Sequence, residues 1–348
     1  MRALSALVLA TLFSFSSFAL GQSVDDALEA YNNGEYTIAF KIFKPIAENG
    51  DFIAQNKLAY LYALGKGVKR NPSAAVKWYR RSAEQGYADS QLVLGAIYFD
   101  GWNVQKDYSE AMGWYRRAAN QSNAEAQFNL GDMYERGKGV SQNYSKAVEW
   151  FRRAAQSGYA KAQFNLGIMY ETGQGVPQDL SEAVEWYRRA AQSGYAKAQF
   201  NLGVMYNRGS GVSQNYSEAV KWYRQASKQG LVRGSFRLGS MYLDGHGVAQ
   251  NYAKGLRLIR SAAEKGDQDA LGTLGFAYLA GQGVDENDAL AYALLSLAVA
   301  NGSKKAQEGR DFALEHLTRK QVSEAQGIAS KWDIGEPLPT PNDFSTYP

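Results

Sequence analysis

The chain contains no cysteine and only two histidines, His246 and His316, among its 348 residues. The lack of cysteine excludes disulfides, thiolate metal sites, thiol catalysis and a lipid anchor attached through a thiol. The two histidines do not stand at the spacing of a metal site. A Gly-x-Ser-x-Gly turn and a glycine-rich phosphate loop are also missing. We therefore expect no enzymatic activity, no catalytic residues, no metal and no cofactor.

A strong charge of one sign is missing as well. The 38 Lys and Arg residues against 34 Asp and Glu residues give a formal net charge of +4. Spread over the whole chain, this excess is too weak to favour nucleic acid as a partner. With a hydrophobic content of 45%, the composition is not that of a disordered protein.

One long apolar run is present, and it stands at the N-terminus. Met1 and Arg2 precede a mostly apolar stretch that ends near Leu20, followed by small residues. This pattern predicts a secretory signal peptide over residues 1–21. The alternative is a retained membrane anchor, but the run is short and interrupted by serines. We expect an exported protein, periplasmic or extracellular, without an integral membrane span once the signal is removed.

Glycine and aromatic residues are abundant, and they recur with a period of 36 residues. The chain has 35 Gly, 23 Tyr, 15 Phe and 7 Trp residues. A Leu-Gly pair recurs at Leu94-Gly95, Leu130-Gly131, Leu166-Gly167, Leu202-Gly203, Leu238-Gly239 and Leu274-Gly275. A valine series from Val68 to Val284 and a glycine series from Gly50 to Gly302 keep the same register. Such ladders identify an internal repeat.

Each repeat is predicted to be a helix hairpin. In the copy over residues 124–158, apolar residues at helical spacing predict a first helix over 124–136, which Gly137 ends by adopting a left-handed conformation. Asn143 is expected to cap a second helix that Gly158 closes. In other copies a Glu stands three residues after the cap and predicts a capping box: Asp107 with Glu110, Asp179 with Glu182 and Asn215 with Glu218.

Small residues predict close packing of the two helices. Gly131 and Ala147 allow a short interaxial distance, and Tyr134 and Trp150 fill the remaining space. Because one hairpin cannot bury both faces, neighbouring hairpins must stack. We predict an all-α, right-handed α–α superhelical solenoid of about seven repeats over residues 24–302, the first one diverged. Two C-terminal capping helices should follow over 303–333, and a flexible tail over 334–348.

The repeat motif resembles the Sel1-like repeat, a relative of the tetratricopeptide repeat. The motif runs Ala-x-x-x-Leu-Gly-x-x-Tyr-x-x-Gly-x-Gly-Val and then Ala-x-x-Trp-(Tyr/Phe)-x-x-Ala-Ala-x-x-Gly, and it covers residues 126–140 with 147–158 and 162–176 with 183–194. The resemblance is to exported bacterial members and implies an adaptor that binds a protein. Some members resemble regulators of signalling or of envelope and exopolysaccharide assembly. A cysteine-rich branch is associated with β-lactam binding, which does not carry over to a chain without cysteine.

The resemblance also implies where a partner binds, because the first helix of each hairpin lines the inner surface of tetratricopeptide-like superhelices. Three rows of residues recur within the first helices of successive repeats. They are Phe128, Phe164, Phe200 and Phe236; Asn129, Asn165 and Asn201; and Lys161, Lys197 and Arg233. The Asn amides could hold the backbone of an extended peptide, and the cations favour an acidic ligand. Glu125 and Asp89 predict a surface that is acidic towards the N-terminus and basic towards the C-terminus.

Each row also has a purely structural interpretation. The Phe rings could pack between adjacent hairpins, the Asn amides could bond to the neighbouring repeat, and the cations could be solvated. The recurrent Trp residues are interpreted as core, whereas Trp102 replaces a loop residue and is expected to be exposed and to contact a partner. Arg pairs such as Arg188-Arg189 are interpreted as a solvated helix face, with Glu149–Arg153 and Glu185–Arg189 ion pairs.

Three functional hypotheses follow from these patterns. The first is a non-catalytic scaffold that binds an unidentified protein partner through the three rows. The second is a module that binds glycans or peptidoglycan fragments, with Trp102 and the Phe row as stacking platforms. The third is a hydrolase, which would require convergent titratable groups in one pocket.

Overall fold

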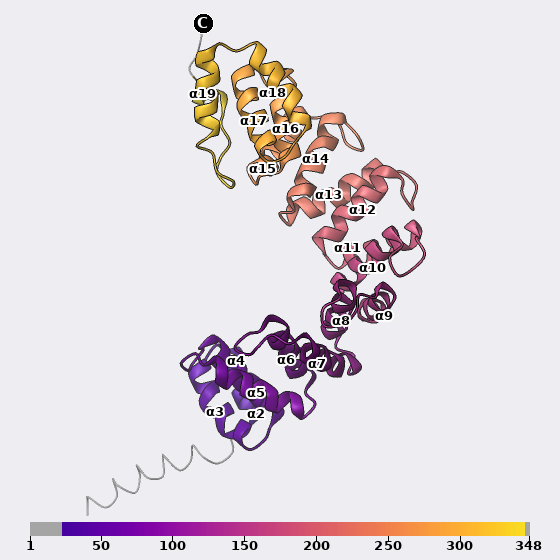
Figure 1. Cartoon of the computed structure of the whole chain (residues 1–348), viewed down its shortest axis with the longest axis vertical. Coiled ribbons are helices and arrows are strands. Elements are labelled where there is room, and N and C mark those ends of the chain that lie inside the picture. Colours follow the sequence, from indigo (N-terminus) through magenta and orange to yellow (C-terminus); the bar gives the residue numbers. More distant parts are fainter. Residues whose placement is uncertain (1–22, 345–348) are drawn as a thin grey trace, which may run out of the picture. The chain divides into compact units, whose positions relative to one another are not determined.

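The computed structural model describes residues 23–344 (Figure 1). The signal peptide predicted for residues 1–21 lies outside these residues. The described chain folds into 18 α-helices and one short 3₁₀-helix, η1 (Pro341–Asp343), without a β-strand in this range. The prediction of an all-helical repeat of about 36 residues is therefore confirmed.

The helices come in pairs along the chain. The first helices of the pairs are α2 (Val24–Asn32), α4 (Phe52–Leu64), α6 (Ala88–Asp100), α8 (Ala124–Arg136), α10 (Ala160–Thr172), α12 (Ala196–Arg208), α14 (Val232–Asp244) and α16 (Gln268–Leu279). The second helices are α3 (Tyr36–Glu48), α5 (Pro72–Glu84), α7 (Tyr108–Asn120), α9 (Tyr144–Gln156), α11 (Leu180–Gln192), α13 (Tyr216–Lys228), α15 (Tyr252–Ala263) and α17 (Asp288–Ala300). The chain continues with α18 (Lys305–Glu315) and α19 (Arg319–Ala329).

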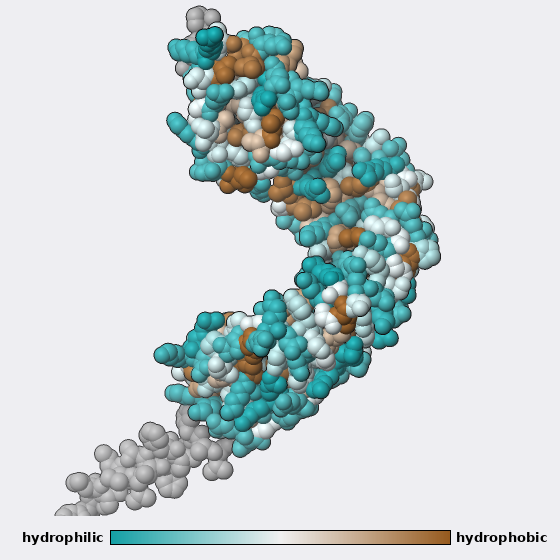
Figure 2. Space-filling view, viewed as in Figure 1, coloured by the Kyte–Doolittle hydropathy of each residue, from teal (hydrophilic) through white to brown (hydrophobic). Residues whose placement is uncertain are grey.

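The described chain divides into two compact units. The N-terminal unit holds residues up to 162 together with 174–176, and the C-terminal unit holds 163–173 together with 177 onwards. The N-terminal unit thus contains α2 to α9, and most of α10 belongs with α11 to α19 in the C-terminal unit. In Figure 2 polar side chains cover most of the visible surface of each unit, with apolar side chains in small patches between them. No helix within residues 23–344 combines the length and apolar character that crossing a membrane requires.

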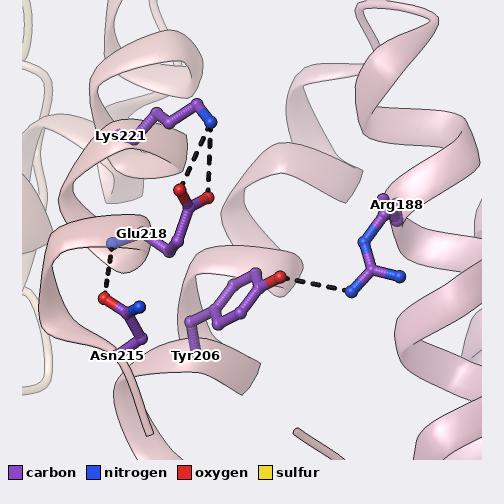
Figure 3. A network of polar contacts seen from close by, with 5 residues as sticks. All are labelled: Arg188, Tyr206, Asn215, Glu218 and Lys221. Carbon is purple, nitrogen blue, oxygen red and sulfur yellow. Dashed lines mark hydrogen bonds and ion pairs between the residues drawn. The ribbon is translucent and has the colours of Figure 1, made fainter. Parts of the chain in front are cut away.

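The predicted caps form, but the predicted capping boxes do not. Asn143 accepts a hydrogen bond from the Lys146 backbone N–H at 2.9 Å, and Gly137 adopts φ 64°. Asn215 caps α13 in the same way, yet the carboxylate of Glu218 pairs with the Lys221 ammonium instead of reaching back to the cap (Figure 3). Reciprocal boxes form at other helix starts, namely Ser23 with Asp26 and Thr318 with Gln321.

Close packing inside each hairpin depends on the glycine of the Leu-Gly pair. A Cβ added at Gly131 would lie 2.5 Å from Cδ1 of Phe151, whose side chain is fully buried. The same contact recurs at 2.7 Å between Gly203 and the Tyr223 ring. The prediction that a small residue at Gly131 lets the helices approach is confirmed. Most of the recurrent tryptophans are buried as predicted: Trp78, Trp114, Trp186 and Trp222.

The consecutive arginines of the second helices make contacts that differ from the predicted ion pairs. The Arg188 guanidinium of α11 donates to the Tyr206 hydroxyl of α12 at 3.2 Å and so connects successive repeats (Figure 3). Arg189 stacks over Trp186 with its Cζ 4.5 Å from the ring centroid, rather than pairing with Glu185. Glu185 pairs with Arg188 instead. The predicted Glu–Arg ion pairs, four residues apart, are wrong because the second Arg of each Arg-Arg sequence stacks on a Trp ring instead. These stacked residues are Arg81, Arg117, Arg153 and Arg189.

The C-terminal segment is packed, which differs from the flexible tail expected after residue 333. Leu338 and Phe344 are buried in the hydrophobic core that α15 to α19 share. The Arg260 guanidinium of α15 donates to the Leu338 carbonyl at 3.2 Å, and the Gly335 N–H donates to the Glu264 carbonyl at 2.7 Å. The segment therefore covers apolar surface that an open repeat end would leave exposed.

Candidate partner-binding groove

Two adjoining cavities form a groove on the C-terminal unit, and the first helices of successive repeats line it. The first cavity has a volume of about 250 Å³ and the second about 310 Å³. The first is lined by Glu171, Phe200, Asn201, Val204, Met205, Arg208, Arg233, Phe236, Arg237, Asp267 and Asp269. The second is lined by Phe236, Arg237, Asp269, Gly272, Thr273, Phe276, Ser303 and Lys305. Phe236, Arg237 and Asp269 line both cavities, so the two lie next to each other.

Helical periodicity explains which residues of α12 reach the groove. Phe200, Val204 and Arg208 stand four residues apart and form one stripe along the helix. Leu202 and Gly203 lie outside this stripe, where Leu202 is fully buried and Gly203 lies against the Tyr223 ring of α13. The repeat core thus uses Leu202 and Gly203, whereas the groove is lined by this stripe together with the adjoining Asn201 and Met205.

The Phe row is half-buried, and its rings pack against other aromatic rings. Phe164 lies between Tyr187 and Tyr195, with ring centroids 5.7 Å and 5.2 Å away. Phe200 lies 5.8 Å from Tyr223. In the N-terminal unit Phe128 is held in the same way by Phe151 and Tyr159. These contacts hold the Phe128, Phe164 and Phe200 rings, whereas Phe236 packs against the hydrophobic core of the C-terminal unit instead. Phe200 and Phe236 form the apolar part of the groove wall.

The Asn row divides into two environments. Asn201 hydrogen-bonds to the Tyr187 hydroxyl, which itself donates to the Glu171 carboxylate. Burial, and next the bond to Glu171, raise the pKa of Tyr187 above its usual range. Asn201 is therefore bound to the preceding repeat, as the structural interpretation predicted. Asn129 and Asn165 are half-buried in α8 and α10.

Three arginines give the groove its main positive charge. Arg208 ends α12, and Arg233 and Arg237 stand one turn apart on α14. None of the three forms a salt bridge with another residue of the described range. Burial raises the pKa of Tyr223 to about 12, and the charges of Arg237 and Arg208 oppose that rise. Both guanidinium groups therefore lie near the buried Tyr223 hydroxyl.

The acidic residues of the groove correct the predicted charge pattern. Asp269 occupies the second position of α16, where Arg233 stands in α14 and Lys197 in α12. The prediction of a surface that stays basic towards the C-terminus is therefore wrong beyond Arg233. Asp267 is already engaged as the cap of α16, accepting from the Ala270 N–H at 2.9 Å.

The other predicted contact residues lie outside the groove. Lys161 and Lys197 are exposed in the first turns of α10 and α12. Trp102 is half-buried and packs against the core of the N-terminal unit, so its predicted exposure is wrong. The adjoining Asn103 takes φ 55°, where the other repeats carry glycine, and bonds to Ser73.

Sequence reasoning missed two of the groove arginines, and one of them left a signal. Arg237 directly precedes Leu238 and thus replaces the Asn found at the same position in three earlier repeats. Arg208 has a counterpart in Arg136, so periodicity alone did not distinguish it. The difference between them is a contact: Arg136 pairs with Asp132 at 2.7 Å, whereas Arg208 has no such partner in the described chain.

The two histidines lie outside the groove and have local contacts. The His246 ring stacks on Tyr216 at 4.7 Å, as expected for a substituted loop residue, and Nδ1 of His316 lies 3.7 Å from an Asp288 carboxylate oxygen. Within residues 23–344, no cluster of three or more His, Asp or Glu side chains is arranged to hold a metal ion. The groove itself can offer guanidinium donors beside apolar surface, which suits recognition of a carboxylate.

Comparison with known proteins identifies the repeat. The family model of the Sel1 repeat matches seven consecutive segments: 53–87, 88–123, 124–159, 160–195, 196–231, 232–267 and 269–303. A crystal structure of a Sel1 repeat protein from Oxalobacter formigenes is 33% identical, covers 69% of this chain and 96% of its own, and has a TM-score of 0.62.

Two further solved structures are less similar. The protective antigen c5321 of uropathogenic Escherichia coli is 29% identical, with 89% of this chain and 83% of its own covered and a TM-score of 0.45. The immunity protein Pa5087 of Pseudomonas aeruginosa is 19% identical, with 63% and 87% covered and a TM-score of 0.39. A search among curated proteins finds no significant match.

Proposed function

Because the chain belongs to the Sel1 repeat family, whose repeats build scaffolds that typically bind proteins, we propose that it is a non-catalytic adaptor of the bacterial cell envelope. It holds a segment of a partner protein along the groove of the C-terminal unit. The N-terminal apolar run supports export, and with it a periplasmic or extracellular location.

One observation carries this proposal. The groove gathers Phe200, Asn201, Arg233 and Phe236 from two successive repeats, and the resemblance to tetratricopeptide-like repeats had marked these residues as partner contacts. An aromatic wall next to guanidinium groups that form no salt bridge in the described chain has the composition of protein-binding hot spots, which are rich in aromatic residues and Arg.

The glycan alternative finds less support in the side-chain contacts. A stacking platform must present the open face of a ring to a sugar. Trp102 packs against the protein core, and Phe164 lies between two tyrosine rings. A hydrolase would need titratable groups free to act on a substrate, whereas two of the groove carboxylates, Glu171 and Asp267, are bound to protein donors.

Site-specific photocrosslinking in the native cell envelope tests the adaptor function. A photoreactive residue placed at Arg233 or Thr273 faces the groove. The same residue at Lys221 or Arg257 lies on exposed positions of the second helices α13 and α15 and serves as the matched control. We expect one common partner to crosslink from both groove positions and not from the controls. Equal crosslinking from all four positions, or none from the groove, contradicts the proposal.

A further inference from the structure

The contacts of the groove arginines define the chemistry of the ligand. We propose that the groove binds an extended protein segment that carries carboxylate side chains among apolar ones, with a carboxylate bound by Arg208 and Arg237. This inference rests on the proposed adaptor function and narrows it to one class of partner segment.

Many other arginines of the repeats bond to, stack on or pair with a residue of the chain, whereas the groove holds two arginines that have no carboxylate partner in the described range. Arg188 bonds to Tyr206, Arg189 stacks on Trp186 and Arg136 pairs with Asp132. Arg208 and Arg237 form no salt bridge in the described range, although both line the first cavity. A guanidinium presents five N–H donors in a planar fork that matches the two oxygens of a carboxylate. The groove thus offers this fork to a ligand.

The surroundings of these arginines strengthen a bound ion pair. The half-buried Phe200 and Val204 provide apolar surface beside Arg208. Arg237 lies over the Phe236 ring, with its Cζ 5.7 Å from the centroid. A ligand that covers this surface excludes water from the guanidinium groups, and the lower local dielectric makes the charge-assisted hydrogen bonds stronger.

The dimensions of the groove favour a segment of chain over a small molecule. Pockets that enclose small ligands have volumes of about 300–1,000 Å³. The two cavities, at about 250 and 310 Å³, lie at or below the lower end of that range. Because the two separate cavities share Phe236, Arg237 and Asp269, an extended chain can place successive side chains in both. Lys305 in the second cavity offers a second cation along the same path.

Asp269 restricts which acidic segments fit. Its exposed carboxylate stands in the wall that the two cavities share, beside the place proposed for the ligand carboxylate. Like charges repel at this range, so a continuous run of acidic residues is disfavoured. A segment in which apolar residues separate the acidic ones can place an apolar side chain next to Asp269. Asp269 therefore disfavours a ligand carboxylate at this point of the groove, whereas the arginines favour one.

Peptide binding to the full chain, measured by fluorescence anisotropy, tests the inference. The probe is an extended peptide with Glu residues separated by Leu and Ser, and its control has Gln in place of every Glu. We expect the Glu peptide to bind at least about tenfold more tightly, since a hydrogen bond to a charged group contributes on that order. Raising the salt concentration should reduce this difference, because exposed charges are screened.

Replacing Arg208 and Arg237 with the residues that other repeats carry at the same positions tests their roles with a side chain that the fold already accommodates. Arg237→Asn introduces the residue of Asn201, and Arg208→Thr introduces the residue of Thr172. Each should remove most of the preference for Glu over Gln, whereas Asp269→Asn should increase it. Arg136→Thr is the matched control in the N-terminal unit and should leave the preference unchanged.

Three results would overturn the inference: equal binding of the Glu and Gln peptides, no binding of either peptide at millimolar concentration, or a full preference for Glu in the Arg208→Thr/Arg237→Asn double variant. The proposed adaptor function fails on a different result, the absence of a groove-specific partner in photocrosslinking. If a partner crosslinks to Arg233 and Thr273 while the Glu preference is absent, the adaptor function stands and the acidic segment does not.

Discussion

Replacing glycine with alanine should change the unfolding free energy of the N-terminal unit in opposite directions at two helical glycines. Gly131 in α8 and Gly113 in α7 are both helical, and replacing a helical Gly with Ala ordinarily stabilises a helix by about 1 kcal/mol. At Gly113 no atom lies within 4 Å of an added Cβ. At Gly131 the added Cβ would lie 2.5 and 2.6 Å from two atoms of the Phe151 ring.

The size of the effect at Gly131 follows from how far the ring must move. Carbon atoms in contact lie about 3.5–4.0 Å apart, so the Phe151 ring has to shift by about 1 Å. The ring is fully buried, and overpacking of such a site costs about 1–3 kcal/mol. With a cost near the upper end of that range and a helix gain of about 1 kcal/mol, we expect Gly131→Ala to destabilise the unit by about 2 kcal/mol. Gly113→Ala should stabilise it by about 0.5–1 kcal/mol.

Urea unfolding followed by circular dichroism measures the change in unfolding free energy, and hydrogen exchange localises it. Amides of α8 and α9 should exchange about 30-fold faster in Gly131→Ala, which corresponds to about 2 kcal/mol of local opening. Replacing Phe151 with Leu in the Gly131→Ala background should recover part of the loss. If Gly131→Ala and Gly113→Ala both raise stability, the ring gives way without cost and the argument from close packing is refuted.

Other regions of the chain give three further predictions. Ser122 has φ 63° at a position where the other repeats carry glycine, so Ser122→Gly should raise the unfolding free energy by up to about 1 kcal/mol in urea titrations; a decrease would contradict the strain. Leu338→Ala should lower it by about 2–3 kcal/mol because Leu338 is 2% exposed, and an unchanged midpoint would show that the C-terminal segment contributes nothing. Burial raises the pKa of Tyr223 to about 12 from an ordinary 10. Between these two values the folded state retains the phenol proton that the unfolded state loses. The stability that this gives below pH 10 should therefore fall as the pH rises towards 12. Unfolding midpoints from pH 9 to 11.5 measure this fall, which Tyr223→Phe should lessen; a flat profile contradicts it.

Most of the fold could be predicted because its determinants are local. The left-handed glycine at Gly137 and the Asn143 cap are decided by residues within a few positions of each helix end, and the 36-residue ladders repeat these signals. The capping boxes failed where a side chain had a competing partner, as Glu218 has in Lys221. That competition depends on rotamers and charge positions, which a spacing rule does not contain.

The candidate site was only partly predictable, because a spacing pattern does not contain the contacts that side chains make with other repeats. The repeat register and the family resemblance marked Phe200, Asn201, Arg233 and Phe236 on the first helices of two repeats, and the structure places them around one cavity. Neither the register nor the resemblance could show that Asn201 is taken by Tyr187, because that contact joins side chains of two different repeats.

The sequence by itself determined the helical repeat, the pairing of helices and the glycine positions at which helices end and approach, because each rests on local conformation or on a pattern repeated along the chain. Only the tertiary structure decided which polar groups keep a partner. Arg136 and Arg208 occupy equivalent positions, yet Asp132 holds the first and the second faces the groove. Trp102 and Leu338 likewise pack against cores that sequence position did not reveal. The physical reason is that burial and charge pairing are set by neighbours distant in sequence, and a repeat pattern makes equivalent residues look alike even where their neighbours differ.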